Sequence, residues 1–132
     1  MKLGMPAVVF AALFAAAPAL AADPSIGQTA FSLPDNGAAQ QVFKPDAPKI
    51  VLHAQLLDAP KGTTVAADWI AEKTGGAPPN YKIDSAELTT TGEDELEFSL
   101  SKPTTGWPLG DYRVDLTIGG EQAKSAHFRV AE

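Results

Sequence analysis

The chain of 132 residues contains no cysteine. This absence excludes disulfide bonds, a thiol nucleophile and a metal site built on thiolates. It also excludes the lipid attachment of bacterial lipoproteins, which needs a cysteine directly after the signal peptide. We therefore expect an apolar core alone to stabilise the fold, and we expect no cofactor.

Basic residues are scarce as well. Lysine and arginine together number 10 against 16 aspartate and glutamate residues, which gives a formal net charge of −6 at pH 7. Nucleic acids and anionic lipid surfaces select basic patches that displace counterions, so this balance argues against both as partners. After the N-terminal segment, no apolar run approaches the length needed to cross a membrane.

The N-terminal segment has the parts of a secretory signal peptide. Lys2 carries a positive charge, Val8–Ala17 is an apolar run too short to span a bilayer, and Ala19–Ala21 has the small residues at which a signal peptidase cuts. We predict that residues 1–21 are removed, which leaves residues 22–132 as one domain of 111 residues without membrane insertion. The composition of the run is typical of a Gram-negative periplasmic protein, and secretion further out stays open.

Alternation of apolar and polar residues predicts strands along most of the remaining chain. The clearest are Lys49–Leu57, Leu96–Leu100 and Tyr112–Ile118, and Gly119–Gly120 suits the tight turn of a hairpin. The segment Thr63–Lys73 is ambiguous, because its composition favours a helix whereas its alternation favours the strand that we predict. About seven short strands separated by turn residues predict an all-β, antiparallel sandwich.

The stretch Gly106–Val114, with the sequence GWPLGDYRV, resembles part of an immunoglobulin-like or fibronectin-type-III-like domain. Tyr112, with Pro108 and Gly110, is similar to the tyrosine corner of such sandwiches, in which the tyrosine hydroxyl bonds to backbone just upstream. Trp69 takes the place of their core tryptophan. Because the cysteine pair of antibody domains is missing, the chain resembles the cysteine-free bacterial versions of the fold. The chain also looks like small exported bacterial proteins of uncharacterised function. This resemblance implies a fold and a compartment but no activity, because such sandwiches host many functions.

Two aromatic side chains are candidates for partner or ligand binding. Trp107 lies in a turn-rich connection, and Tyr81 follows the loop Thr74–Asn80, which is rich in glycine and proline. If exposed, either ring could contact a protein or stack on a sugar. The alternative, which we favour for Trp107, is that it folds back to cover the end of the core beside Tyr112.

The histidines and carboxylates are weak candidates for a metal site. A site that uses His53 and His127 would need the two imidazoles adjacent and a further ligand, and both are predicted on the polar faces of strands. The acidic turn Glu93–Glu97 does not have the spacing of a calcium loop. We predict no metal site. No Gly-x-Ser-x-Gly motif or other catalytic set is present, so we predict no enzyme activity.

These observations predict a non-enzymatic, exported binding or accessory module whose partner is another envelope protein. The first alternative is a carrier of a small ligand, a glycan or a peptide, that uses Trp107 and Tyr81. The second is a metal-binding protein that uses His53 and His127. The identity of the partner and the oligomeric state stay open.

Overall fold

The computed structural model describes residues 23–34 and 37–132, and within these ranges it contains eight β-strands and no helix. The predicted all-β class is confirmed. The predicted signal peptide, residues 1–21, lies outside the described residues. Residues 23–34 and 37–132 include no helical segment that could span a membrane.

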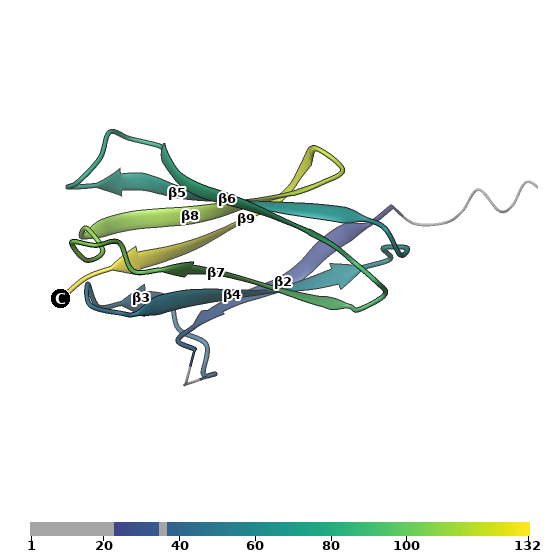
Figure 1. Ribbon diagram of the computed structural model, residues 1–132, viewed down its shortest axis with the longest axis horizontal. Helices are drawn as coiled ribbons and strands as arrows, with labels where there is room; N and C mark the ends of the chain where they lie inside the picture. Colours follow the sequence, from purple (N-terminus) through teal and green to yellow (C-terminus); the bar gives the residue numbers. More distant parts are fainter. Residues whose placement is uncertain (1–22, 35–36) are drawn as a thin grey trace, which may run out of the picture.

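The strands form two sheets, one of three strands and one of five (Figure 1). The three-stranded sheet consists, in spatial order, of β2 (Ser25–Ser32), β4 (Lys49–Leu57) and β7 (Glu95–Ser101). The five-stranded sheet consists, in spatial order, of β3 (Val42–Phe43), β9 (Glu121–Val130), β8 (Gly110–Ile118), β5 (Thr64–Thr74) and β6 (Tyr81–Thr89).

One strand pair departs from the antiparallel pattern. β3 runs parallel to β9, with Val42 opposite Arg129 and Phe43 opposite Val130. The chain leaves the three-stranded sheet after β2 and then follows the last strand of the other sheet in the same direction. Pro45 lacks a backbone N–H for a longer ladder, which keeps β3 short. The expectation of a purely antiparallel sandwich is therefore wrong at this strand.

The ambiguous segment Thr63–Lys73 coincides, within one residue at each end, with strand β5 (Thr64–Thr74), so the predicted strand is confirmed and the helix alternative is wrong. Val65, Ala67 and Trp69 point into the core, and each is at most 2% exposed. Helix propensity does not decide this segment, because β5 lies between β8 and β6 and its backbone is paired on both sides.

An aromatic cluster centred on Phe128 joins the two sheets. The Phe128 ring lies 4.9 Å from Phe31 of the opposite sheet, and it stacks on Tyr112 at 4.9 Å with an interplanar angle of 7°. Trp69 and Trp107 each meet it edge to face at 6.2 Å. Aromatic side chains remove about 150–250 Å² each from water, so this cluster supplies much of the apolar burial of the domain.

The two long sides of the sandwich differ. On one side the sheets are joined, because β2 lies against β9 and β3 pairs with β9. On the other side the outermost strands are β6 and β7, which leave their connecting turn and separate along the molecule (Figure 1). Among the described strands, each of these two has a hydrogen-bonded neighbour on one side alone. This open side presents the long unpaired edges of both sheets.

Candidate functional site

The side chain of Trp107 is buried, and only 2% of the residue is exposed. Its Nε1–H donates a hydrogen bond to the Ala47 carbonyl oxygen at 2.9 Å, and its ring meets Tyr112 edge to face at 5.8 Å. Trp107 therefore covers the end of the core, which is the alternative that we favour on the sequence. Its other interpretation, as an exposed binding residue, is wrong because a partner cannot reach the ring.

Tyr112 makes the contact that defines a tyrosine corner. Its hydroxyl donates a hydrogen bond to the Pro108 carbonyl oxygen at 2.5 Å, which ties the start of β8 to the preceding connection. Burial raises the pKa of the Tyr112 phenol to about 12, so the hydroxyl keeps its proton at neutral pH. Gly110 opens β8 with a φ of 142°, where a Cβ atom would lie 2.7 Å from the Cα of Thr74. Pro108, Gly110 and Tyr112 thus have structural roles.

The other two aromatic candidates lie at opposite extremes of burial. Trp69 is 2% exposed and meets Phe31 edge to face at 6.4 Å, within the core. Tyr81, at the start of β6, is 52% exposed. Because Trp107 is buried, Tyr81 and Trp107 do not form a common aromatic wall for a small ligand.

The two histidines lie in different sheets, His53 on β4 and His127 on β9, and they line different pockets. Across residues 23–34 and 37–132, no group of three histidine, cysteine, aspartate or glutamate side chains is placed to hold a metal ion. The geometry therefore gives no support to a metal site shared by His53 and His127.

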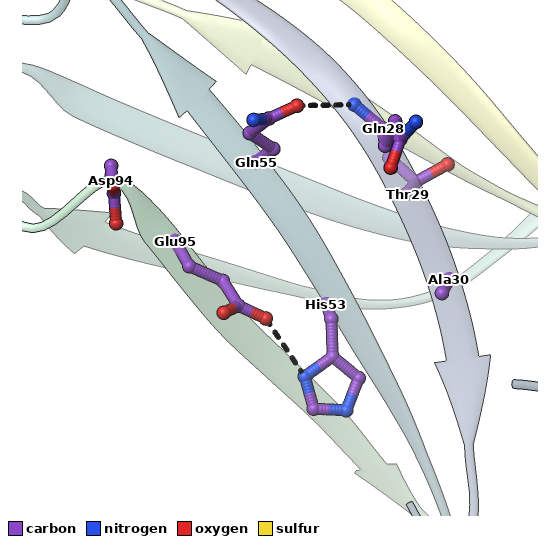
Figure 2. Close-up of a pocket in the computed structure, with 7 residues that line it drawn as sticks. All are labelled: Gln28, Thr29, Ala30, His53, Gln55, Asp94 and Glu95. Atoms are coloured by element: carbon purple, nitrogen blue, oxygen red, sulfur yellow. Dashed lines mark hydrogen bonds and ion pairs between the residues drawn. The ribbon is translucent and has the colours of Figure 1, made fainter. Parts of the chain in front are cut away.

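His53 lines a pocket of about 370 Å³ on the outer face of the three-stranded sheet (Figure 2). Its Nδ1 lies 3.4 Å from a carboxylate oxygen of Glu95 and 4.0 Å from one of Glu97. Across the pocket, the Gln28 backbone N–H donates to the side-chain oxygen of Gln55 at 3.1 Å, where the pairing of β2 with β4 shifts its register. Carboxylate, imidazole and amide groups dominate this surface, so it suits polar or cationic groups better than an apolar ligand.

Ser32, His53 and Glu95 are connected in the order of a hydrolase triad, which the sequence did not indicate. Ser32 Oγ lies 3.2 Å from His53 Nε2, and the Glu95 carboxylate lies 3.4 Å from the other ring nitrogen, Nδ1. Ser32 is only 2% exposed, however, so its hydroxyl is closed to a substrate. The contact satisfies a buried hydroxyl, and we assign it a structural role. No local motif could have revealed it, because Ser32 and His53 meet only through the pairing of β2 with β4.

β6 presents core-facing side chains to solvent. Leu88 is 38% exposed, Tyr81 is 52% exposed, and Ala86 is exposed too. Their partners on β5 are the buried residues Val65, Ala67 and Ala71. Directly opposed residues lie on the same face of a sheet, so these three β6 side chains point to the core side. They are uncovered because the three-stranded sheet ends at β7. We call the surface formed by Tyr81, Ala86 and Leu88 the β6 overhang.

The turn between β6 and β7 is held by the carboxylate of Glu93. It accepts hydrogen bonds from the Thr90 hydroxyl at 2.8 Å, from the Thr91 backbone N–H at 2.6 Å and from the Thr91 hydroxyl at 3.1 Å. A hydrogen bond from its own backbone N–H, followed by those from Thr90 and Thr91, lowers the pKa of Glu93 from its ordinary value of 4.5 to about 2.

This lowered pKa predicts an acid dependence of stability. The carboxylate form stabilises the fold fully above pH 4.5, and the contribution is lost as the pH falls towards about 2. We expect Glu93→Gln to melt a few degrees below the wild type at pH 7, and the two melting curves to merge near pH 2. Glu121→Gln, at an exposed glutamate of the β8–β9 hairpin, is the control. An acid-independent difference between wild type and Glu93→Gln would contradict the assigned hydrogen bonds.

Comparison with known proteins defines the class of this fold. No family model matches the chain, and no curated protein matches it. A solved immunoglobulin-like protein from Pseudomonas aeruginosa superposes with a TM-score of 0.60 at 14% identity, over 85% of this chain and 99% of that one. The Pseudomonas fluorescens alkylpurine DNA glycosylase AlkC, bound to DNA containing an abasic site analog, gives a TM-score of 0.54 at 18% identity, over 84% of this chain and 31% of that one. At these identities the similarity establishes the fold alone, and the fold is an immunoglobulin-like β-sandwich.

Proposed function

We propose that this chain is an exported, non-enzymatic module that binds another protein of the bacterial envelope. The β6 overhang carries the proposal. Eight of the nine β6 residues are exposed. Ala86 and Leu88 expose apolar surface to water on the face of the sheet that is buried at the paired strand β5. A protein that covers this face removes that surface from water, which favours association by about 25 cal/mol per Å².

Export belongs to the same proposal. The signal-like residues 1–21 support removal after Ala21, with residues 22–132 as the module in the periplasm or beyond. The absence of catalysis is supported by Ser32, since the hydroxyl that faces His53 is closed to substrates.

Other functional classes have less support. A small-ligand carrier would use both Trp107 and Tyr81, and Trp107 is buried. We do not propose that this chain binds DNA, although the glycosylase that shares the fold does. This chain spans 31% of that protein, and its net charge of −6 does not suit a phosphate backbone.

Capture from an envelope extract tests the proposal. We expect the mature protein to retain a defined envelope protein, and Leu88→Ser to bind that protein about tenfold more weakly, because a small polar group replaces an apolar contact. After purification of the captured protein, calorimetry gives the Kd of each variant.

Leu57→Ser is the matched control. Leu57 is 38% exposed, like Leu88, but it ends β4 in the other sheet. Its substitution is expected to leave the Kd unchanged. Equal losses in the two variants, or catalytic turnover of an envelope substrate by the purified protein, would contradict the proposal.

A further inference from the structure

The backbone of β7 is hydrogen-bonded on one side. The Leu56 N–H donates to the Asp94 carbonyl oxygen at 2.8 Å, and the Lys102 N–H donates to the Pro48 carbonyl oxygen at 2.9 Å. These two bonds lie at the ends of the antiparallel ladder between β4 and β7. Hydrogen-bonded pairs alternate along such a ladder, so the even-numbered β7 residues bond to β4. The residues that direct their N–H and C=O groups to the open side are Glu95, Glu97, Ser99 and Ser101.

β6, the other edge of the open side, is protected against a further strand. Its pairing with β5 skips Ile83, and such a bulge bends and twists an edge. The Thr90 N–H donates to the Thr63 carbonyl oxygen, so by the same alternation the Ser85 N–H points away from β5. That N–H is already bonded to Asp84 Oδ1 at 2.8 Å. β7 pairs in continuous register over its seven residues and has no such protection, so it is the better template.

A second copy of this chain is a poor occupant of the β7 edge. The side chains of Glu95 and Glu97 are 61% and 64% exposed. Antiparallel pairing of two β7 strands would gather the glutamates of both copies on one face of the joined sheet, and neighbouring like charges destabilise cross-strand pairs. The same carboxylates attract lysine and arginine. Charge therefore favours a different, basic segment.

We propose that the envelope partner adds an extended segment to the free edge of β7. Its lysine or arginine side chains lie on the face shared with Glu95 and Glu97, and its apolar side chains lie on the other face. This inference rests on the proposed function. Side chains alternate between faces along a strand, so the apolar set points to the side of the sheet where the β6 overhang is uncovered. One segment of alternating basic and apolar residues thus meets both surfaces.

A short peptide of alternating lysine and valine, with blocked ends, is the probe, and a peptide of alternating glutamate and valine is its control. In amide NMR spectra of the wild-type protein, we expect the lysine peptide to shift the signals of Glu95, Glu97, Ser99 and Ser101 and to slow their exchange with solvent. The control peptide is expected to bind at least about tenfold more weakly, because its carboxylates face those of β7.

Two proline variants test the assignment of the edge. Ser99→Pro removes an N–H from the open side and keeps the ladder to β4, so we expect at least about tenfold weaker binding of the lysine peptide. Glu87→Pro makes the same change on β6, because the backbone N–H of Glu87 also points away from β5. We expect it to change the affinity for the lysine peptide less than about twofold. Ser99→Ala is the control for loss of the hydroxyl, and melting curves verify that each variant folds.

The outcomes separate this inference from the proposed function. Peptide contacts confined to β6, equal binding of the two peptides, or wild-type affinity in a folded Ser99→Pro variant would overturn the β7 assignment. A captured envelope protein that depends on Leu88 and binds Ser99→Pro normally would overturn it too, and would leave the proposed function standing. A lysine peptide on β7 without any captured envelope protein would support the edge and contradict the function. The NMR experiment needs no substitution, so it decides the edge even where a proline variant fails to fold.

Discussion

Replacement of Trp107 by alanine is expected to lower the free energy of unfolding by about 3–5 kcal/mol. The indole is almost fully buried, and its ring packs edge to face against Tyr112 at 5.8 Å and Phe128 at 6.2 Å. Removal leaves a cavity at the end of the core, and it also leaves the Ala47 carbonyl oxygen without its hydrogen bond from the indole. Urea denaturation and thermal melting measure the loss, and we expect the melting midpoint to fall by more than about 10 °C.

Leu109→Ala is the control, because Leu109 lies in the same connection but is 47% exposed. Its effect is expected to stay within about 0.5 kcal/mol. If Trp107→Ala melted like the wild type, the indole would not cover the core. That result would support the alternative in which Trp107 is an exposed binding residue.

Trp107 and Leu109 differ in burial although they lie two positions apart, and this difference depends on contacts that the local sequence does not contain. Both residues lie in one turn-rich connection, and the sequence favours burial of Trp107 only through its expected place at the end of the core beside Tyr112. The burial of Trp107 depends on Ala47, which is sixty positions away and belongs to the segment that follows β3. Such a contact exists only after the two sheets have packed. The local sequence therefore favours burial of Trp107 beside Tyr112, but it does not identify Ala47 as the hydrogen-bond partner.

Alternation, by contrast, predicted the strands well where one face is buried. In β8 the residues Tyr112, Val114 and Leu116 are at most 1% exposed, as the pattern requires. The same pattern decided β5 against its helical composition, because burial in a sheet outweighs intrinsic propensity. β3 has only two residues and was too short to carry an alternation that predicts its parallel partner.

The candidate binding surfaces depend on sheet order, which alternation does not contain. Leu88 follows a strand-like pattern and would be buried if a strand of the other sheet covered β6. The free edge of β7 likewise follows from its place beside β4 alone. Alternation did predict that Glu97 lies on the polar face, whereas Glu95, expected in the acidic turn, is the first residue of β7. That His53 stands beside them follows from the register of β4 with β7, which joins residues some forty positions apart.

The other large effect is expected at Gly110, where Gly110→Ala should cost about 3 kcal/mol or more in free energy of unfolding. Two separate causes add there. The φ of 142° is a conformation that residues with a side chain rarely adopt. In addition, a Cβ would overlap the backbone of β5, because it would lie 2.7 Å from the Cα of Thr74, which pairs with Gly110. Backbone cannot move aside as a flexible side chain can, so β8 and β5 must separate at this end.

Gly119→Ala isolates the first cause. Gly119 also has a positive φ, 59°, but it lies in the β8–β9 hairpin with no atom within 4 Å of its added Cβ. We expect a loss of about 1 kcal/mol there, from backbone conformation alone. Chemical denaturation of the two variants side by side measures the difference, which reports the close approach of β8 to β5. Equal losses would mean that the two strands have room for a side chain at Gly110. The glycine would then serve the turn into β8 alone, and the tyrosine corner that follows it would not depend on tight packing against β5.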